Sequence, residues 1–75
     1  MQSFEVTGTV WIGRGDMAAR ECRSVVVYSP TRAQTWLYVD KDTNELVFAG
    51  EVDTVWHDID LDDARERFAD VLRCI

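Results

Sequence analysis

Residues 60–75 constrain the fold most, because they have the pattern of an amphipathic helix. Their apolar residues recur at helical spacing and fall on one stripe of roughly 100°: Leu61, Ala64, Phe68, Val71, Leu72 and Ile75. The opposite side of the helix carries carboxylates: Asp62, Asp63, Glu66 and Asp70. Asp60 suits the N-cap position and Asp63 the third helical position, close to a capping box. Such a helix must cover an apolar surface, which the rest of the chain has to supply.

The preceding residues are predicted to supply that surface as a β-sheet. Alternation and β-branched content predict four strands, at residues 4–12, 24–29, 35–39 and 45–52. The first strand places four apolar residues on one side, Phe4, Val6, Val10 and Ile12, with Gly8 marking a bulge or a close approach. The fourth strand has the option of running on past Gly50 to Trp56. Polar turns at residues 13–16 and 40–44 separate strands.

Residues 16–23 have two interpretations. Their helix propensity, with Asp16 as an N-cap, indicates a short helix. The same residues could form the first half of a long return strand, which we favour because a helix of two turns would be poorly buried. The predicted fold class is therefore α+β, with residues 1–75 in one small domain. It consists of an antiparallel four-stranded meander with the C-terminal helix packed on one face, and a short extra helix near residues 16–23 is the alternative.

One helix cannot cover such a sheet, since four strands span about 19 Å and a helix is about 10 Å wide. One set of apolar residues is expected to face the helix: Phe4, Leu37, Val39, Leu46 and Phe48. A second set is expected to point away: Trp11, Trp36, Tyr38 and Val47. Exposed patches of this kind mark contact surfaces, so we expect a homodimer or a docked partner on Trp11, Trp36 and Tyr38. The alternative is that strand register or sheet curvature buries these aromatic residues within one chain.

The charge of the chain is unevenly distributed. Residues 1–35 hold three acids and four bases, a net of +1, and residues 36–75 hold eleven acids and four bases, a net of −7, which together give −6. This balance argues against direct binding to nucleic acid or to a membrane, because both require a basic footprint. It favours a protein partner with a basic surface. Without an apolar span or a signal-like start, the expected location is cytoplasmic, with Cys22 and Cys74 as reduced thiols.

No catalytic apparatus is predicted. His57 next to Asp58 could act as a base, and Cys22 or Cys74 as a nucleophile, but no oxyanion motif or phosphate-binding loop accompanies them. Residues 58–63 resemble the start of an EF-hand calcium loop, yet Asp63 replaces the required glycine and Ala69 the final glutamate. We therefore expect no enzymatic activity, no metal and no cofactor.

The remaining candidate site is the acidic surface. Asp62, Glu66 and Asp70 advance by about 6 Å per step along the helix, against 3.4 Å between successive phosphates of one DNA strand. The expected partner-binding surface comprises these carboxylates and their neighbours: Asp62, Asp63, Glu66, Asp70, Glu51 and Asp53. The bland interpretation is a helix face that is acidic because it faces water, with Asp63 paired to Arg67 or Asp62 to Arg65.

Two functions follow from these surfaces. The first is a non-catalytic acidic binding protein that inhibits or regulates a larger nucleic-acid-handling complex, as a nucleic-acid mimic would. In size and acidity alone the chain is similar to many small phage and mobile-element inhibitors, including anti-CRISPR proteins. The second is a small adaptor or assembly module that dimerises or docks through the aromatic face of its sheet.

Overall fold

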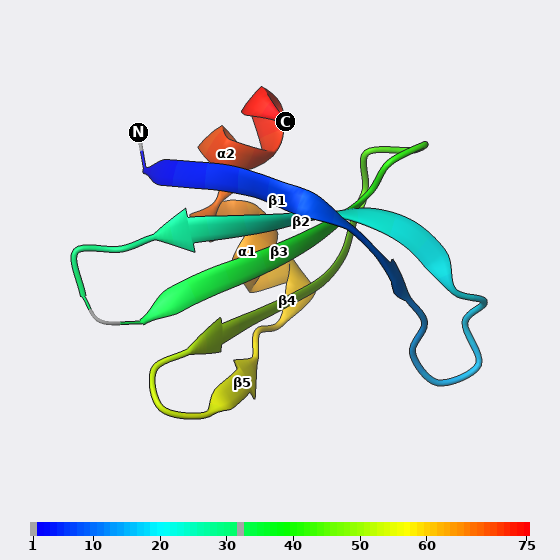
Figure 1. The fold of residues 1–75 in the computed structure, drawn as a ribbon, viewed down its shortest axis with the longest axis horizontal. Helices are drawn as coiled ribbons and strands as arrows, with labels where there is room; N and C mark the ends of the chain where they lie inside the picture. The colour runs from blue at the N-terminus through cyan, green and yellow to red at the C-terminus, as the bar shows by residue number, and fades with distance from the viewer. Residues whose placement is uncertain (1, 32) are drawn as a thin grey trace.

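The computed structural model describes residues 2–31 and 33–75, which form an antiparallel five-stranded sheet and two short C-terminal helices (Figure 1). The strands are β1 (Ser3–Ile12), β2 (Arg20–Tyr28), β3 (Gln34–Asp40), β4 (Leu46–Val52) and β5 (Trp56–Asp58). The helices are α1 (Leu61–Arg67) and α2 (Ala69–Cys74). The α+β class and the antiparallel meander are confirmed, but the counts of four strands and one helix are not.

The fifth strand arises because the fourth does not run on to Trp56. β4 ends at Val52, and the chain reverses so that Val52 pairs with Trp56 and Gly50 with Asp58. The Asp53 side chain fixes this turn, since its Oδ1 accepts the backbone N–H groups of Thr54 and Val55 at 2.5 and 3.4 Å. An aspartate that hydrogen-bonds the backbone just after itself favours a turn over a continuing strand.

The short helix near residues 16–23 is absent, and β2 begins at Arg20 instead. Pairing of Ile12 with Arg20 and of Trp11 with Glu21 ties these residues to β1, which overrides their modest helix propensity. Residues 17–19 belong to the connecting loop, so the longer return strand is correct only from Arg20 onward. Gly15 adopts a φ of +57° in this loop, a conformation that glycine tolerates without strain.

The bulge predicted at Gly8 is confirmed. Val6 pairs with Val25 and Gly8 with Ser24, so Thr7 is an extra residue in β1. Its hydroxyl donates to the carbonyl of Ser24 at 3.1 Å, which holds the bulge to β2. An inserted residue reverses the alternation of side chains beyond it. Val10 and Ile12 therefore lie on the opposite face from Phe4 and Val6, and the expectation that all four share one side is wrong.

The C-terminal helix begins as predicted but is interrupted. The Asp60 carboxylate accepts the N–H of Asp63 at 3.1 Å, as an N-cap does. α1 then ends at Arg67, and Phe68, with φ −116° and ψ 25°, connects it to α2. This joint lets Ala64, Phe68 and Val71 all reach the twisted sheet, where each is buried.

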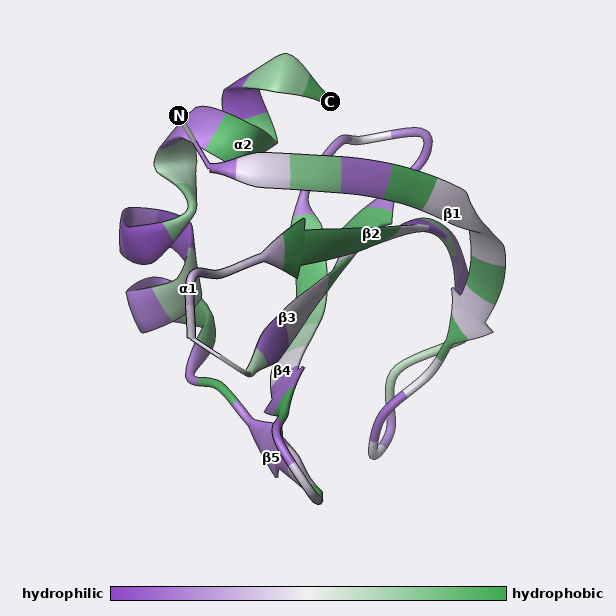
Figure 2. Cartoon of the chain, turned by 60° about the vertical axis from the view of Figure 1, so that its left-hand side comes forward, coloured by the Kyte–Doolittle hydropathy of each residue, from purple (hydrophilic) through white to green (hydrophobic). Residues whose placement is uncertain are grey.

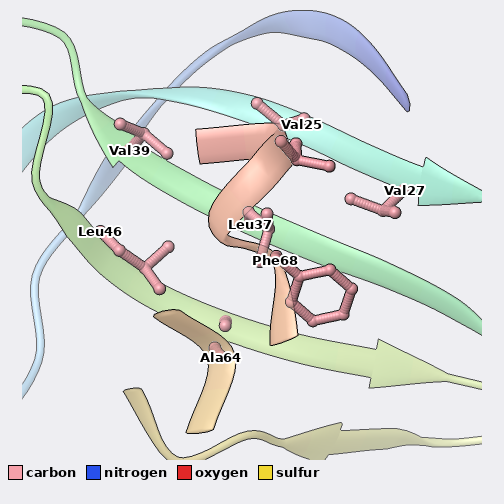
Figure 3. Packing of buried hydrophobic residues seen from close by; sticks show 9 residues of the cluster. Val25, Val27, Leu37, Val39, Leu46, Ala64 and Phe68 are labelled. Carbon is pink, nitrogen blue, oxygen red and sulfur yellow. The ribbon is translucent and has the colours of Figure 1, made fainter. Parts of the chain in front are cut away.

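The core lies between the helices and one face of the sheet, as Figure 3 shows. Its buried members are Val25, Val27, Leu37, Val39, Leu46, Ala49, Ala64, Phe68 and Val71. Phe48 was expected here but faces the other way, because a register shift pairs Val39 with Leu46 and Tyr38 with Phe48. Val47 is the extra residue of that shift and is itself buried rather than exposed.

The sheet is strongly twisted and curved. In Figure 2 the second half of β1 bends away from α1 and α2, and the loop that follows it turns toward β5. The Arg14 side chain connects this loop to β5, since its Nη2 lies 3.0 Å from Oδ2 of Asp58. The face that carries no helix is therefore partly enclosed by the first hairpin of the chain.

Candidate protein-binding surfaces

The outward carboxylates of the helices are paired with arginines. Asp62 contacts Arg65 at 2.9 Å in α1, and Asp70 contacts Arg73 in α2. These pairs are exposed, so each contributes little stability. Their effect on the surface is larger, because positive and negative groups now alternate where a continuous acidic stripe was predicted.

Arg67 joins two of the acids that the sequence proposed for one surface. Its guanidinium lies 3.7 Å from Asp63 and 4.0 Å from Glu51, which connects α1 to β4. Glu66 is exposed, and within residues 2–31 and 33–75 no cation lies within ion-pair distance of it. Of the helix acids, Glu66 thus retains the least compensated charge.

Asp53 serves a different purpose from the other proposed acids. It lies in the β4–β5 turn, where the backbone N–H of Thr54 and then that of Val55 lower the pKa of its carboxyl. His57 lies 3.9 Å away and adds to that lowering. The role of Asp53 is therefore to form the β4–β5 turn, and it does not belong with the acids of the helices.

The aromatic residues of the helix-free face form a cluster. Tyr38 stacks on Phe48 with ring centroids 5.7 Å apart, and Trp56 lies 5.6 Å from Phe48 and 6.4 Å from Tyr38. Trp36 pairs with Gly50 on the same face. Trp36, Tyr38 and Phe48 are half-buried, and burial raises the pKa of the Tyr38 hydroxyl. Curvature of the sheet therefore covers part of the predicted aromatic face within one chain.

Arg14 and Asp58 close over this cluster. The Arg14 guanidinium lies 4.2 Å from the centre of the Phe48 ring, a cation–π distance. Asp58 accepts a hydrogen bond of 2.7 Å from Nε1 of Trp56, and this bond, followed by Arg14, lowers the pKa of the Asp58 carboxyl. Arg14 and Asp58, the charged groups near Phe48, are thus paired with each other within the chain.

Trp11 does not belong to the aromatic cluster. It pairs with Glu21, whereas Trp36 pairs with Val26, and five positions along β2 separate these partners. An odd separation on a regular strand places the two indoles on opposite faces of the sheet. Trp11 is 68% exposed, so the structure separates it from Trp36 and Tyr38 and leaves it open to solvent.

Trp11 lies on β1, which forms one edge of the sheet. In the part of the chain that the structure describes, β2 is the only strand that pairs with β1. Val6, Val10 and Trp11 are all exposed, and Glu5 is the single charged residue of the strand. The alternation of residues 3–12 does not reveal this edge, because a strand with a single charge is equally typical of the middle of a sheet.

The residues considered for catalysis or metal binding have other roles. Cys22 is buried, which raises the pKa of its thiol, whereas Cys74 is exposed. Asp58 and Asp60, the start of the calcium-like sequence, bind Arg14 and cap α1. Among the described residues, no group of three histidine, cysteine or acidic side chains is placed to hold a metal ion.

A shallow hollow of about 610 Å³ lies between the start of β1, the end of β2 and the joint of the helices. Its two charged lining residues are Arg67 and Asp70, which already pair with neighbours on the helices or β4. The hollow therefore presents no concentrated charge to a ligand. Over the described chain, the helices are too short and too polar to cross a membrane.

In comparisons with protein-family models, with curated proteins and with solved structures, the chain has no match.

Proposed function

We propose that this chain is a non-catalytic protein-binding module that accepts a strand of another polypeptide on the outer edge of β1. The observation that carries the proposal is the character of that edge. β1 is ten residues long, has one charged residue and exposes Val6, Val10 and Trp11. An unpaired edge is a template for a further strand, and proteins usually protect it with short length, lysine or proline. β1 has none of these three protections, and a fourth device, a β-bulge, is present only at Thr7 and Gly8, before the regular segment.

The second half of β1 is the part best suited to pairing. From Gly8 to Ile12 its residues pair with Ser24 to Arg20 without a register shift, so its outer backbone groups keep the regular spacing of a strand. Thr7 and Gly8 interrupt the pattern before this segment, as bulges on protected edges do. An incoming strand would therefore find its regular template at residues 8–12.

Two kinds of contact would hold such a strand. Backbone hydrogen bonds supply affinity in recognition by strand addition, and side chains of alternate residues supply specificity. Trp11 offers the largest exposed apolar side chain of β1. Tryptophan is enriched among the residues that dominate binding energy at protein interfaces. Trp11 is thus the expected anchor, and Val10 the expected contact on the other face.

The proposal is tested with a matched pair of lysine substitutions. Val10→Lys adds a charge to the β1 edge, and Val55→Lys adds one to a more exposed valine in the β4–β5 turn. Each purified variant is immobilised, and the proteins it retains from the source cell are compared with those of the unmodified chain, including untagged copies of the chain itself. We expect Val55→Lys to retain the same partner and Val10→Lys to lose it. A partner retained by Val10→Lys, or lost from both variants, contradicts the proposal.

The second candidate function is an acidic inhibitor or regulator of a nucleic-acid-handling complex with a basic groove. The observation in its favour is the net charge of −6 together with exposed Asp62, Glu66 and Asp70 on the helices. The pairing of Asp62 with Arg65 and of Asp70 with Arg73 weighs against it. Neutralising all three acids as Asp62→Asn, Glu66→Gln and Asp70→Asn should then abolish partner capture and its salt dependence. Unchanged capture by that triple variant rejects this candidate and leaves the edge proposal standing.

A further inference from the structure

The occupant of the β1 edge can be inferred from the distribution of charge around it. The first hairpin, from Ser3 to Tyr28, contains three acids and three bases, so its net charge is zero. The acids are Glu5, Asp16 and Glu21, and the bases are Arg14, Arg20 and Arg23. The whole net charge of −6 therefore belongs to the rest of the chain, on β3 to β5, their turns and the helices.

This separation sets which partners can approach the edge. A strongly basic partner would be attracted to the acidic remainder of the molecule, where the field is negative. A second copy of the chain would be repelled by that remainder, but it meets no net charge at the first hairpin. Resting on the proposed strand addition, we infer that the strand accepted by β1 is β1 of a second copy, in an antiparallel dimer with one continuous sheet.

The regular segment of β1 allows a specific register. In a twofold antiparallel pair a central residue lies opposite its own copy, and every other residue pairs symmetrically around it. With Val10 at the centre, Trp11 lies opposite Thr9 of the second copy and Ile12 lies opposite Gly8. Each large side chain then meets a small one, and the paired segment is the stretch that follows the bulge.

The same register keeps like charges apart. Glu5, the single charge of β1, lies outside residues 8–12 and is not opposed to its copy. Figure 2 shows that this half of β1 lies away from α1 and α2, so the helices do not obstruct a strand at this edge. The acidic parts of the two copies would lie on the outer sides of the joined sheet.

The oligomeric state of the full chain provides the first test. Sedimentation equilibrium over a range of concentrations should show a dimer for the unmodified chain and for Val55→Lys. Val10→Lys and Trp11→Ala should each weaken the dimer by at least about tenfold, while far-UV circular dichroism shows that both remain folded. Added salt should leave the dimer unchanged or strengthen it, because it screens repulsion between the acidic parts.

Cross-linking tests the register directly. Val10→Cys is introduced into a Cys22→Ala, Cys74→Ser background, because Cys74 is an exposed thiol and Cys22 pairs directly with residue 10 across β1 and β2. Residues directly opposite in an antiparallel pair lie about 4.5–5.5 Å apart at Cα, within the range of a disulfide. Oxidation should therefore link two Val10→Cys chains, whereas a Val55→Cys control in the same background should stay unlinked at equal concentration.

The outcomes separate this inference from the proposed function. A chain that is monomeric up to about 1 mM, yet captures a different partner through Val10, overturns the second copy and leaves strand addition standing. A monomeric chain whose partner capture is unaffected by Val10→Lys overturns both the inferred second copy and the proposed strand addition. A dimer that Val10→Lys and Trp11→Ala leave intact, or that forms no Val10→Cys link, also overturns the inference.

Discussion

β5, at one edge of the sheet, is three residues long and ends on a charged aspartate, whereas β1, at the other edge, is ten residues long and carries one charge. β5 is also held by contacts from elsewhere in the chain. Trp56 packs on Gly50, its Nε1 donates to Asp58, and Arg14 reaches Asp58 from the first hairpin. One edge is thus completed by the chain's own side chains, and the other leaves a regular segment and an exposed Trp11 to solvent.

The comparison shows that the two edges place different demands on their residues. Changes at β5 should act on the folding of the single chain, because its side chains contact β3, β4 and the first hairpin. Changes at the second half of β1 should act on association, because its side chains contact little within the chain.

The most severe change to the β5 edge is Gly50→Val. A Cβ at Gly50 would overlap the indole ring of Trp56, which lies directly over this glycine. Overfilling a packed site usually costs about 1–3 kcal/mol, and we expect a loss of that size in the free energy of unfolding measured with urea. The Trp56→Ala background removes the obstructing ring, so Gly50→Val should cost clearly less there. If Gly50→Val lowers the free energy of unfolding equally in both backgrounds, overlap with the Trp56 ring is not the cause of the loss.

Two tryptophan substitutions give the most direct comparison of the edges. Trp56→Ala removes contacts with Phe48 and Tyr38 and the hydrogen bond to Asp58. Aromatic pairs contribute about 0.5–1.5 kcal/mol beyond their burial, so we expect Trp56→Ala to lower the free energy of unfolding by about 1–2 kcal/mol. Trp11→Ala should change it by less than about 0.5 kcal/mol in dilute solution, where the chain is monomeric. The division between the edges fails if the two losses are equal.

The helix that follows β5 depends on its N-cap for part of its stability. Asp60 caps α1 through its bond to the N–H of Asp63, and replacing such a cap by alanine typically costs about 1 kcal/mol. We therefore expect Asp60→Ala to lower the free energy of unfolding by about that amount in a urea titration. Asp62→Ala is the matched control, since Asp62 lies in the same turn, is exposed and caps nothing. If Asp62→Ala lowers the free energy of unfolding as much as Asp60→Ala, the effect comes from charge at the start of the helix and not from the cap.

The smallest effect is expected at Asp58, and it depends on pH. The Trp56 hydrogen bond and then Arg14 hold the pKa of this carboxyl below its ordinary value of 3.8. Because the folded pKa is below the unfolded one, the ionised form stabilises the fold above the unfolded pKa. That contribution is lost as the pH falls through the folded pKa. Asp58→Ala should therefore be less stable than the unmodified chain at pH 7, and the difference should shrink below about pH 4. A difference that stays constant from pH 7 to pH 2.5 would contradict this origin.

Much of the fold could be predicted because its signals are local. Asp60 has the side chain of an N-cap, and Gly8 interrupts an alternating strand, so the cap was predicted at the correct residue and the bulge within one residue of Thr7. The shift that turns Phe48 away from the core was not predictable in this way. Val47 and Phe48 are both apolar, so the pattern did not distinguish which of them leaves the regular alternation.

The candidate surfaces depended on contacts between distant residues and were less predictable. Arg14 and Asp58 are 44 positions apart, and neither has a neighbour in the sequence that indicates the other. The pairing of Asp62 with Arg65 follows from helical spacing and was anticipated, whereas that of Glu51 with Arg67 depends on how α1 crosses β4. Which strand becomes an edge depends on the order of strands, and the alternation within one strand carries no information about it.

The strand order also determines how the chain can assemble. Every strand pairs with the next one along the sequence, so each hairpin closes a short loop at low entropic cost. Chains dominated by such nearby pairings fold faster than those that must join distant segments. All five strands precede the helices in the chain, and the apolar face of the sheet is covered only when α1 and α2 pack on it. The last sixteen residues of the chain therefore decide whether the apolar face of the sheet is buried within one molecule, through Ala64, Phe68 and Val71.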